Sequence, residues 1–423
     1  PMNHSRKSVK GQVMRKKCVL IIIDGMGDLP VPELSGKTPL EAARTPVLDQ
    51  LAGSGRYGQV NPILPGEIPN THSGTGMLMG LLPEQADRLS RGPVESAGRG
   101  RKLSMGDVAV RANFATMGAA GGEFMVTDRR AGRISTGTKE LAASLSDIDL
   151  GDGIRGSLMP TDQHRGVLIL AGPGLDASVS DTDPGSSVLP AAMRTCLPLE
   201  SGAELTATKI NDFVDEARRR LANHPVNIAR VRDGLLPANC ILTRGAGSQL
   251  ELDNVLITRG FKVAAVAGCN TVRGLSRIFG FDVIDDPRFT ATLETDVHAK
   301  IGAAISALRD HDMVFVHFKA PDICSHDLQP LAKRDFLQRV DEAMQPLLWE
   351  GVVVAVAADH TTDSNTGFHT ADPVPALISS ADPDRTGEPV SFGEALCRQG
   401  NMDRQLSSDF LLKVLDTMGY PEA

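Results

Sequence analysis

Three nearly uninterrupted apolar runs constrain the fold of this chain more than any other feature. They cover residues 19–23, 313–318 and 352–358. Runs of this kind are typical of strands buried on both faces, as in a parallel sheet covered by helices. Strand-like and helix-like segments also alternate from about residue 235 onward, which favours a parallel sheet. We therefore predict an α/β fold with a mostly parallel sheet flanked by helices.

Each of these runs leads to a carboxylate. Asp24 directly follows the first run, Asp322 comes shortly after the second, and Asp359 follows the third. Three histidines lie close by in the chain, namely His326, His360 and His369. The carboxyl ends of parallel strands meet at one edge of the sheet, where ligands bind, and carboxylate with imidazole suits a divalent metal ion. Helix capping would explain one such aspartate but accounts poorly for three, so we expect a metal site at this edge.

A hydroxyl-rich loop spans residues 69–76 and runs into an apolar, helix-like segment. Hydroxyl groups at such a junction lie where exposed backbone N–H groups and the helix dipole favour phosphate or alkoxide. Threonine and serine are also preferred N-caps, so that capping alone would explain their presence. The local sequence leaves both interpretations open.

Composition argues against several classes of protein. The formal net charge of −8 speaks against a nucleic-acid partner, and no apolar stretch approaches the length of a membrane span. The six cysteines are scattered without CxxC spacing, which indicates neither a disulfide framework nor a structural zinc module. Residues 1–16 are polar and basic and contain no signal-peptide core, so we expect a disordered tail. The sequence thus predicts a soluble, cytoplasmic protein without a membrane partner, and it gives no indication of oligomeric state.

The middle of the chain has a different character from the parts on either side. Half-alternating strand patterns there precede apolar residues at helical spacing over 205–221, which is typical of a separate α+β unit. We expect residues 17–108 and 235–423 to form one core domain. Residues 109–234 would form a smaller substrate or cap domain inserted into it.

The inserted segment contains a dense basic cluster at Arg129, Arg130 and Arg133. Guanidinium groups bind carboxylate or phosphate through two parallel hydrogen bonds. We expect this cluster to contact an anion, with a solvated charged face as the alternative for any single arginine.

A series of motifs, in a fixed order, matches one known family. The motifs are IDGMGD at 23–28, TPLEAA at 38–43, RGPVE at 91–95, DRRAGR at 128–133, HRG at 164–166, SDTDP at 180–184, APD at 320–322 with His326, ADH at 358–360 and HTADPVP at 369–375. Over roughly residues 18–378 the chain resembles the archaeal-type cofactor-independent phosphoglycerate mutases of the alkaline phosphatase superfamily. The number and order of the motifs make this resemblance specific.

The resemblance implies an alkaline-phosphatase-like core with two divalent metal ions and no 2,3-bisphosphoglycerate. The ions would be Mn²⁺ or Zn²⁺, with Mg²⁺ or Co²⁺ as alternatives. Matched to the family motifs, the ligands of one ion would be Asp322, His326 and His369. The ligands of the other would be Asp24, Asp359, His360 and the nucleophile.

The nucleophile of the family is a serine, and here the sequence departs from the family pattern. Matching the loop to the family motif places Thr71 at this position, with Ser73 as the alternative. A metal-activated threonine hydroxyl can attack phosphorus and form a phospho-enzyme. His72 and Thr75 also replace an acidic residue and a histidine of the family pattern, and Lys319 stands where the family tends to have an acidic residue.

The resemblance implies interconversion of 2- and 3-phosphoglycerate through a phospho-threonine intermediate. The departures at His72 and Thr75 leave open a diverged enzyme that transfers or hydrolyses another phosphate ester or a phosphonate in specialised metabolism. A third alternative is a non-catalytic metal- or ligand-binding homologue, which the complete ligand set argues against. The expected partner is a small phosphorylated carboxylate or, under the second alternative, a phosphonate. We expect substrate contacts from Arg129, Arg130, Arg133, His164, Arg165, Asp181 and Arg273.

Overall fold

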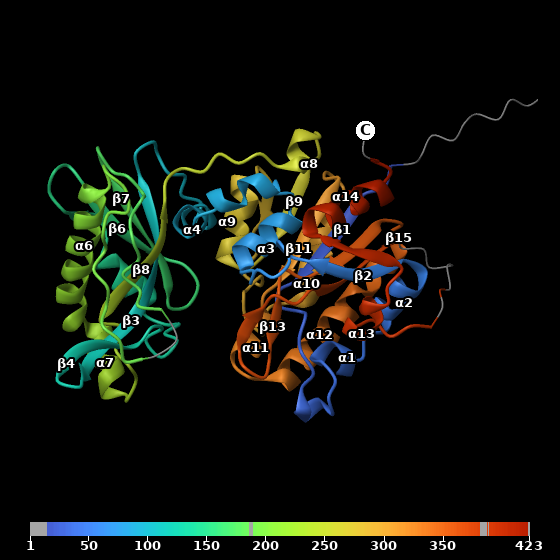
Figure 1. The fold of residues 1–423 in the computed structure, drawn as a ribbon, viewed down its shortest axis with the longest axis horizontal. Helices are drawn as coiled ribbons and strands as arrows, with labels where there is room; N and C mark the ends of the chain where they lie inside the picture. Colours follow the sequence, from blue (N-terminus) through green and yellow to red (C-terminus); the bar gives the residue numbers. More distant parts are fainter. Residues whose placement is uncertain (1–14, 186–188, 381–386, 388, 422–423) are drawn as a thin grey trace, which may run out of the picture.

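The computed structural model describes residues 15–185, 189–380, 387 and 389–421. Within these residues the chain forms two units, each built around its own sheet (Figure 1). Most of the tail that we expected to be disordered lies outside the described residues. Of that segment, the backbone N–H of Lys16 donates a hydrogen bond to the carbonyl oxygen of Met418 at 2.8 Å.

The larger unit contains an eight-stranded sheet of order β10-β9-β11-β1-β12-β15-β2-β16. Its strands are β1 (Cys18–Ile23), β2 (Arg56–Asn61), β9 (Val263–Val266), β10 (Asp282–Ile284), β11 (Met313–Phe318), β12 (Val353–Ala357), β15 (Val374–Ser380) and β16 (Met402–Leu406). The five strands from β10 to β12 pair in parallel, whereas β15 runs antiparallel to both of its neighbours. The predicted α/β fold with a mostly parallel sheet is confirmed.

The three apolar runs form the adjacent central strands β11, β1 and β12 of this sheet. Every residue of these strands is buried, because helices pack against both faces of the sheet. The helices of this unit are α1 (Pro39–Ala42), α2 (Pro46–Ser54), α3 (Thr71–Leu78), α4 (Arg91–Gly98), α8 (Val255–Thr258), α9 (Asn270–Ile278), α10 (Val297–Ala307), α11 (Ala320–His326), α12 (Pro330–Met344), α13 (Glu394–Arg398) and α14 (Ser407–Thr417). In the described part of the chain, none of the helices is both long enough and apolar enough to cross a membrane.

The smaller unit contains a six-stranded antiparallel sheet with helices against it (Figure 1). Its elements are β3 (Val108–Ala120), β4 (Glu123–Asp128), β5 (Ile148–Asp149), β6 (Arg155–Pro160), β7 (Arg165–Ala171), β8 (Cys240–Gly247), α5 (Thr138–Ala143), α6 (Glu204–Ala222) and α7 (Pro225–Arg232). The helical pattern expected over 205–221 is α6, which buries Ile210, Phe213 and Ala217. Strand β8 pairs with β3, so this sheet extends to residue 247, beyond the boundary expected at residue 234.

The chain passes between the units twice, through residues 99–107 and 248–254. Helix α4 packs against β3, β7 and β8 of the smaller unit and against α9 of the larger one, and Figure 1 shows it between the two sheets. At Gly274 of α9 a side chain would overlap the carbonyl oxygen of Val94 in α4. The absence of a side chain at this position therefore permits the close approach of α4 and α9 that joins the units.

Candidate active site

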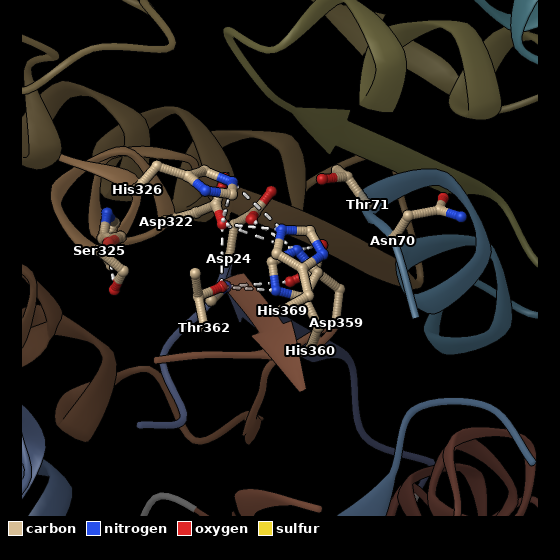
Figure 2. A network of polar contacts seen from close by, with 12 residues as sticks. Asp24, Asn70, Thr71, Asp322, Ser325, His326, Asp359, His360, Thr362 and His369 are labelled. Atoms are coloured by element: carbon tan, nitrogen blue, oxygen red, sulfur yellow. Dashed lines mark hydrogen bonds and ion pairs between the residues drawn. The ribbon is translucent and has the colours of Figure 1, made fainter. Parts of the chain in front are cut away.

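The carboxylates of the predicted metal site converge because β1 lies between β11 and β12. Asp24 directly follows β1, Asp359 lies just beyond β12, and Asp322 lies in α11, the helix that follows β11. All three carboxylates are buried. Figure 2 shows them gathered with the imidazole rings beside the start of α3.

Asp322, His326 and His369 form a first potential ligand group, whose ligand atoms all lie within 4.8 Å of one another. Oδ1 of Asp322 lies 3.3 Å from Nε2 of each histidine. His326 is one helical turn after Asp322 in α11, and His369 lies in β14 (Phe368–Thr370), which pairs with β13 (Thr361–Asp363). These three residues are the set expected for one of the two ions.

A second group surrounds Asp24. Nε2 of His360 lies 3.2 Å from Oδ1 of Asp24 and 3.4 Å from Oδ2 of Asp359. The same nitrogen lies 4.0 Å from Oδ1 of Asp322, so the two groups adjoin. Nε2 of His317 lies 3.0 Å from the other carboxylate oxygen of Asp24, and its ring forms a further potential ligand group with Asp24 and Asp359. His317 was not among the expected ligands, because it occurs inside an apolar strand.

Hydrogen bonds hold the imidazole rings in the tautomer that a metal ligand requires. Nδ1 of His326 donates to the carbonyl oxygen of Gly367 at 2.6 Å, and Nδ1 of His369 donates to that of Pro69 at 2.9 Å. The two Nε2 atoms face each other at 3.2 Å. Since a neutral imidazole carries one proton, both Nε2 atoms present lone pairs, and a cation between them would relieve their repulsion.

The ring of His360 is held in the same tautomer, but by a side-chain hydroxyl instead of a backbone carbonyl oxygen. The Oγ1 of Thr362 donates to Oδ1 of Asp322 at 2.9 Å, and it therefore accepts from Nδ1 of His360, also at 2.9 Å. Nε2 of His360 is buried without a hydrogen-bond partner among the described residues. A buried, unpartnered nitrogen next to carboxylates fits a divalent metal ion, and the donor set as a whole suits Mn²⁺ or Zn²⁺.

The electrostatics of Asp359 also fit a bound cation. Burial and the neighbouring carboxylate of Asp24 raise the pKa of Asp359 well above its ordinary value. Its oxygens accept hydrogen bonds from the backbone N–H of Gly25 at 3.1 Å and from Oγ1 of Thr75 at 3.2 Å. A positive ion at this position would stabilise the ionised carboxylate.

Lys319 places its ammonium group between the two ligand groups. Its Nζ lies 2.9 Å from Oδ1 of Asp24 and 2.6 Å from Oδ2 of Asp322. Burial acts to lower the pKa of Lys319, but the two carboxylates outweigh burial and hold this pKa above its ordinary value. Burial likewise opposes ionisation of Asp24, and Lys319 nevertheless holds the pKa of Asp24 below its usual range. Lys319 was absent from the expected site residues, although its position directly after β11 was a signal available in the sequence.

The start of α3 contains both a helix cap and a half-buried hydroxyl that takes no part in the cap. Oδ1 of Asn70 accepts the N–H groups of His72 and Ser73, each at 3.2 Å. Oγ of Ser73 donates to the carbonyl oxygen of Asn70 and accepts the N–H of Asn70, each at 3.1 Å. Oγ1 of Thr71 instead lies 2.9 Å from Nζ of Lys319. Asn70 and Ser73 therefore form the cap, and Thr71 contacts the charged cluster.

A cavity of about 350 Å³ lies where the two units meet beside the ligand groups. Lys319, Asp322 and His326 line it from the larger unit. Four of the seven expected substrate contacts line it from the smaller unit, namely Arg130, Arg133, His164 and Arg165. Arginine side chains and the carboxylate–imidazole groups therefore face the same space.

The other three expected substrate contacts have protein partners of their own. Arg129 forms two hydrogen bonds with the carboxylate of Asp183, at 2.6 and 2.5 Å. Arg273 pairs with Asp285 at 2.5 Å, and Asp181 accepts the N–H of Gly245 at 2.8 Å. The densest basic cluster in the sequence is thus partly neutralised inside the protein.

The fold and the site together define an α/β protein with a candidate dinuclear metal centre at the carboxyl edge of its sheet. A family model described as "2,3-bisphosphoglycerate-independent phosphoglycerate mutase" matches residues 52–227. A protein of that description from Methanopyrus kandleri is 40% identical, over 95% of this chain and 96% of its own length. One from Archaeoglobus fulgidus is 38% identical, over 95% of this chain and 97% of its own length.

Solved structures agree with these matches. A protein from Pyrococcus horikoshii has a TM-score of 0.78 at 30% identity, over 97% of this chain and 99% of its own. The cofactor-independent phosphoglycerate mutase of Thermoplasma acidophilum has a TM-score of 0.60 at 32% identity, over 95% of this chain and 98% of its own. The chain belongs to the family of 2,3-bisphosphoglycerate-independent phosphoglycerate mutases, which confirms the family expected from the motifs.

Proposed function

We propose that this protein interconverts 2- and 3-phosphoglycerate by phosphoryl transfer through Thr71. The observation that carries the proposal is the 2.9 Å contact between Oγ1 of Thr71 and Nζ of Lys319, beside two carboxylate–imidazole groups. Full-length relatives described as phosphoglycerate mutases support this substrate. The comparisons do not favour the alternative of a phosphonate or another phosphate ester.

The proposed reaction uses two bound divalent metal ions. Asp322, His326 and His369 would hold one of them, and Asp24, Asp359, His360 and Thr71 would hold the other. When bound, the ions would neutralise charge on the transferred phosphoryl group and lower the pKa of the attacking hydroxyl. Mn²⁺ and Zn²⁺ both suit these donors. Because Thr71 itself accepts the phosphoryl group, the reaction requires no 2,3-bisphosphoglycerate.

The transfer consists of two balanced steps. In the first, the oxygen of Thr71 bonds to phosphorus while the ester bond to one glycerate oxygen breaks, and that oxygen gains a proton as Thr71 loses one. In the second, the other glycerate hydroxyl attacks phosphorus, and the oxygen of Thr71 leaves and regains its proton. The Lys319 ammonium group, fixed by Asp24 and Asp322, stabilises the negative charge on the threonine oxygen in both steps.

The smaller unit, which we place at about residues 109–247, would act as the cap that encloses glycerate between the two steps. Burial together with Arg165 and Arg130 lowers the pKa of His164 to about 2. His164 is therefore neutral and can hydrogen-bond to a glycerate hydroxyl without adding charge. A closed cap excludes water, which would otherwise hydrolyse the phospho-threonine and release phosphate.

Two further features are part of the proposal. The order of the central strands, with the acidic residues at their carboxyl ends, supports an alkaline-phosphatase-like core. All six cysteines are free and buried, which fits a reducing compartment such as the cytoplasm.

Phosphorus NMR of the manganese-loaded protein with 3-phosphoglycerate tests the proposal directly. We expect 2-phosphoglycerate to appear, and we expect the Thr71→Ala variant to form none. Release of inorganic phosphate would indicate a phosphatase instead. Absence of any reaction by the metal-replete protein would contradict the proposed substrate.

A further inference from the structure

A buried lysine of α12 contacts three separate segments of the chain. Nζ of Lys333 lies 2.7 Å from Oδ2 of Asp28, and both side chains are fully buried. The same nitrogen lies 2.9 Å from Oγ of Ser325. It also lies 3.2 Å from the carbonyl oxygen of Gly27 and 3.3 Å from that of Thr362. One ammonium group is therefore surrounded by oxygens of residues that are far apart in the sequence.

Further hydrogen bonds connect the partners of Lys333 with one another. The N–H of Ser364 donates to Oδ1 of Asp28 at 2.9 Å, and its Oγ donates to Oδ2 at 2.5 Å. Oγ of Ser325 lies 3.1 Å from Oγ of Ser364. We call Lys333, Asp28, Ser325 and Ser364 the Lys333 cluster. Among the residues that line the cavity beside the ligand groups, none belongs to this cluster, so it does not contact a substrate bound there.

The three segments that contact Lys333 are the segments that carry most of the proposed metal ligands. The first runs from Asp24, which follows β1, to Asp28. The second is α11, which carries two of the three ligands of the other ion, and the third begins at His360 and continues into β13. Figure 2 shows Ser325 and Thr362 beside the ligand groups. Lys333 therefore joins segments of both groups.

Thr362 provides the most direct link from Lys333 to the ligands. Its carbonyl oxygen faces Lys333, and its N–H donates at 3.0 Å to the carbonyl oxygen of Gly27, which Lys333 also approaches. Its hydroxyl group contacts both His360 and Asp322 at 2.9 Å. Lys333 thus fixes the backbone of a residue whose side chain orients one ligand from each group.

Stability alone is a weak reason for a charge at this position. Lysine is seldom fully buried unless it is paired, and a buried ion pair is often no more stabilising than apolar side chains of similar volume. An ammonium group with partners in three segments does, however, set the distances between those segments. Groups that support metal ligands from outside the coordination sphere affect metal affinity for this reason.

We propose that Lys333 is a positioning residue that fixes the two ligand groups relative to each other. This inference rests on the two-metal centre of the proposed function. Lys333 acts through Asp28, Ser325 and the backbone of Thr362, and it does not touch the substrate. Because it contacts segments of both groups, its loss should weaken the binding of both ions.

Binding of Mn²⁺ in the absence of substrate tests this role. The EPR signal of free Mn²⁺ during a titration gives the dissociation constants of both equivalents. The double variant Lys333→Met with Asp28→Asn removes the ion pair without leaving an unpaired buried charge. We expect it to bind both equivalents roughly 10-fold or more weakly, which is typical for loss of groups that support metal ligands.

A milder variant keeps the test available if the double variant does not fold. Ser325→Ala removes one neutral partner of Lys333 and no charge. It should weaken both equivalents by about fivefold, which corresponds to the loss of one hydrogen bond.

Asp341→Ala is the matched control for a loss of stability. Asp341 is buried in the same helix, about two turns beyond Lys333. It accepts the N–H groups of Val47 and Leu48 at 3.2 and 2.8 Å. This variant should lower Tm and bind Mn²⁺ as tightly as the unsubstituted protein. Unchanged affinities in the folded Lys333 and Ser325 variants would overturn the proposal, as would weakening that is confined to one equivalent or matched by the control.

Turnover of the unsubstituted protein separates this inference from the proposed reaction. If that protein binds two equivalents of Mn²⁺ but forms no 2-phosphoglycerate, the proposed reaction is wrong while the difference in Mn²⁺ affinity remains. If it binds no Mn²⁺, the positioning role is overturned together with the metal centre.

Discussion

The hydroxyl oxygen of Thr71 and the ammonium nitrogen of Lys319 lie 2.9 Å apart, although 247 residues separate them in the chain. The contact forms because α3 begins beside the carboxyl end of β11. Asp24 and Asp322 keep Lys319 charged despite its burial. A fixed positive charge beside the attacking oxygen stabilises the charge that develops there, without reorganisation of solvent.

Removal of the Lys319 charge should slow the reaction strongly. We expect Lys319→Met to lower kcat by about 100-fold or more, the usual effect of deleting a charged group that stabilises a transition state. Metal content, measured by mass spectrometry, should stay near that of the unsubstituted protein, because no ligand is lost. A variant that retained full kcat would show that Lys319 only balances the charges of Asp24 and Asp322.

Substitution of the two hydroxyl residues at the start of α3 should affect different properties, namely turnover for Thr71 and stability for Ser73. Thr71→Ala should abolish turnover, because the phosphoryl acceptor is lost. Ser73→Ala should keep most activity and lower the free energy of unfolding by about 1 kcal/mol, the typical cost of a lost cap. Steady-state kinetics and urea unfolding of both variants measure these effects. Full activity of Thr71→Ala together with an inactive Ser73→Ala would assign the nucleophile to Ser73.

Loss of one imidazole should remove one ion. His326→Ala deletes a nitrogen that faces His369 at 3.2 Å, so we expect about one fewer equivalent of bound metal and loss of activity. His311→Ala is the matched control, because His311 pairs with the exposed Asp282 away from the site. Elemental analysis after dialysis gives the stoichiometry. Two equivalents bound by His326→Ala would exclude His326 as a required ligand.

Glu394 should make stability depend on pH. Burial raises its pKa to about 7, while its oxygens accept from Oγ1 of Thr38 at 2.6 Å and from the N–H of Asp28 at 3.1 Å. The folded-state pKa lies above the unfolded value near 4.5. The protonated group therefore contributes stability below about pH 4.5, and that contribution is lost as the pH rises through about 7.

The free energy of unfolding should fall by about 3 kcal/mol over this pH range, which is the energy that corresponds to the difference in the pKa of Glu394 between the folded and the unfolded protein. Glu394→Gln, which does not titrate, should show a smaller fall in the free energy of unfolding between pH 5 and pH 8 than the unsubstituted protein. Urea unfolding at both pH values measures the difference. Parallel pH profiles for the two proteins would contradict this assignment.

The sequence alone determined the fold class and the family, and it predicted six of the carboxylate and imidazole side chains that the structure brings together at the sheet edge, but not His317. Continuous apolar runs predict buried parallel strands, and a carboxylate at the end of such a strand must emerge at the sheet edge. These features depend on a few neighbouring residues, so they can be recognised without knowing which strands pair.

Tertiary structure decided which charges compensate one another. It placed β1 between β11 and β12, brought Lys319 and His317 to Asp24, and paired Arg129 with Asp183. It also placed Arg111 directly opposite Arg244 in the pairing of β3 with β8. Contacts of this kind join segments far apart in the chain and depend on strand order and register. Whether an arginine is neutralised inside the protein or available to a substrate therefore follows from the packing of the sheets.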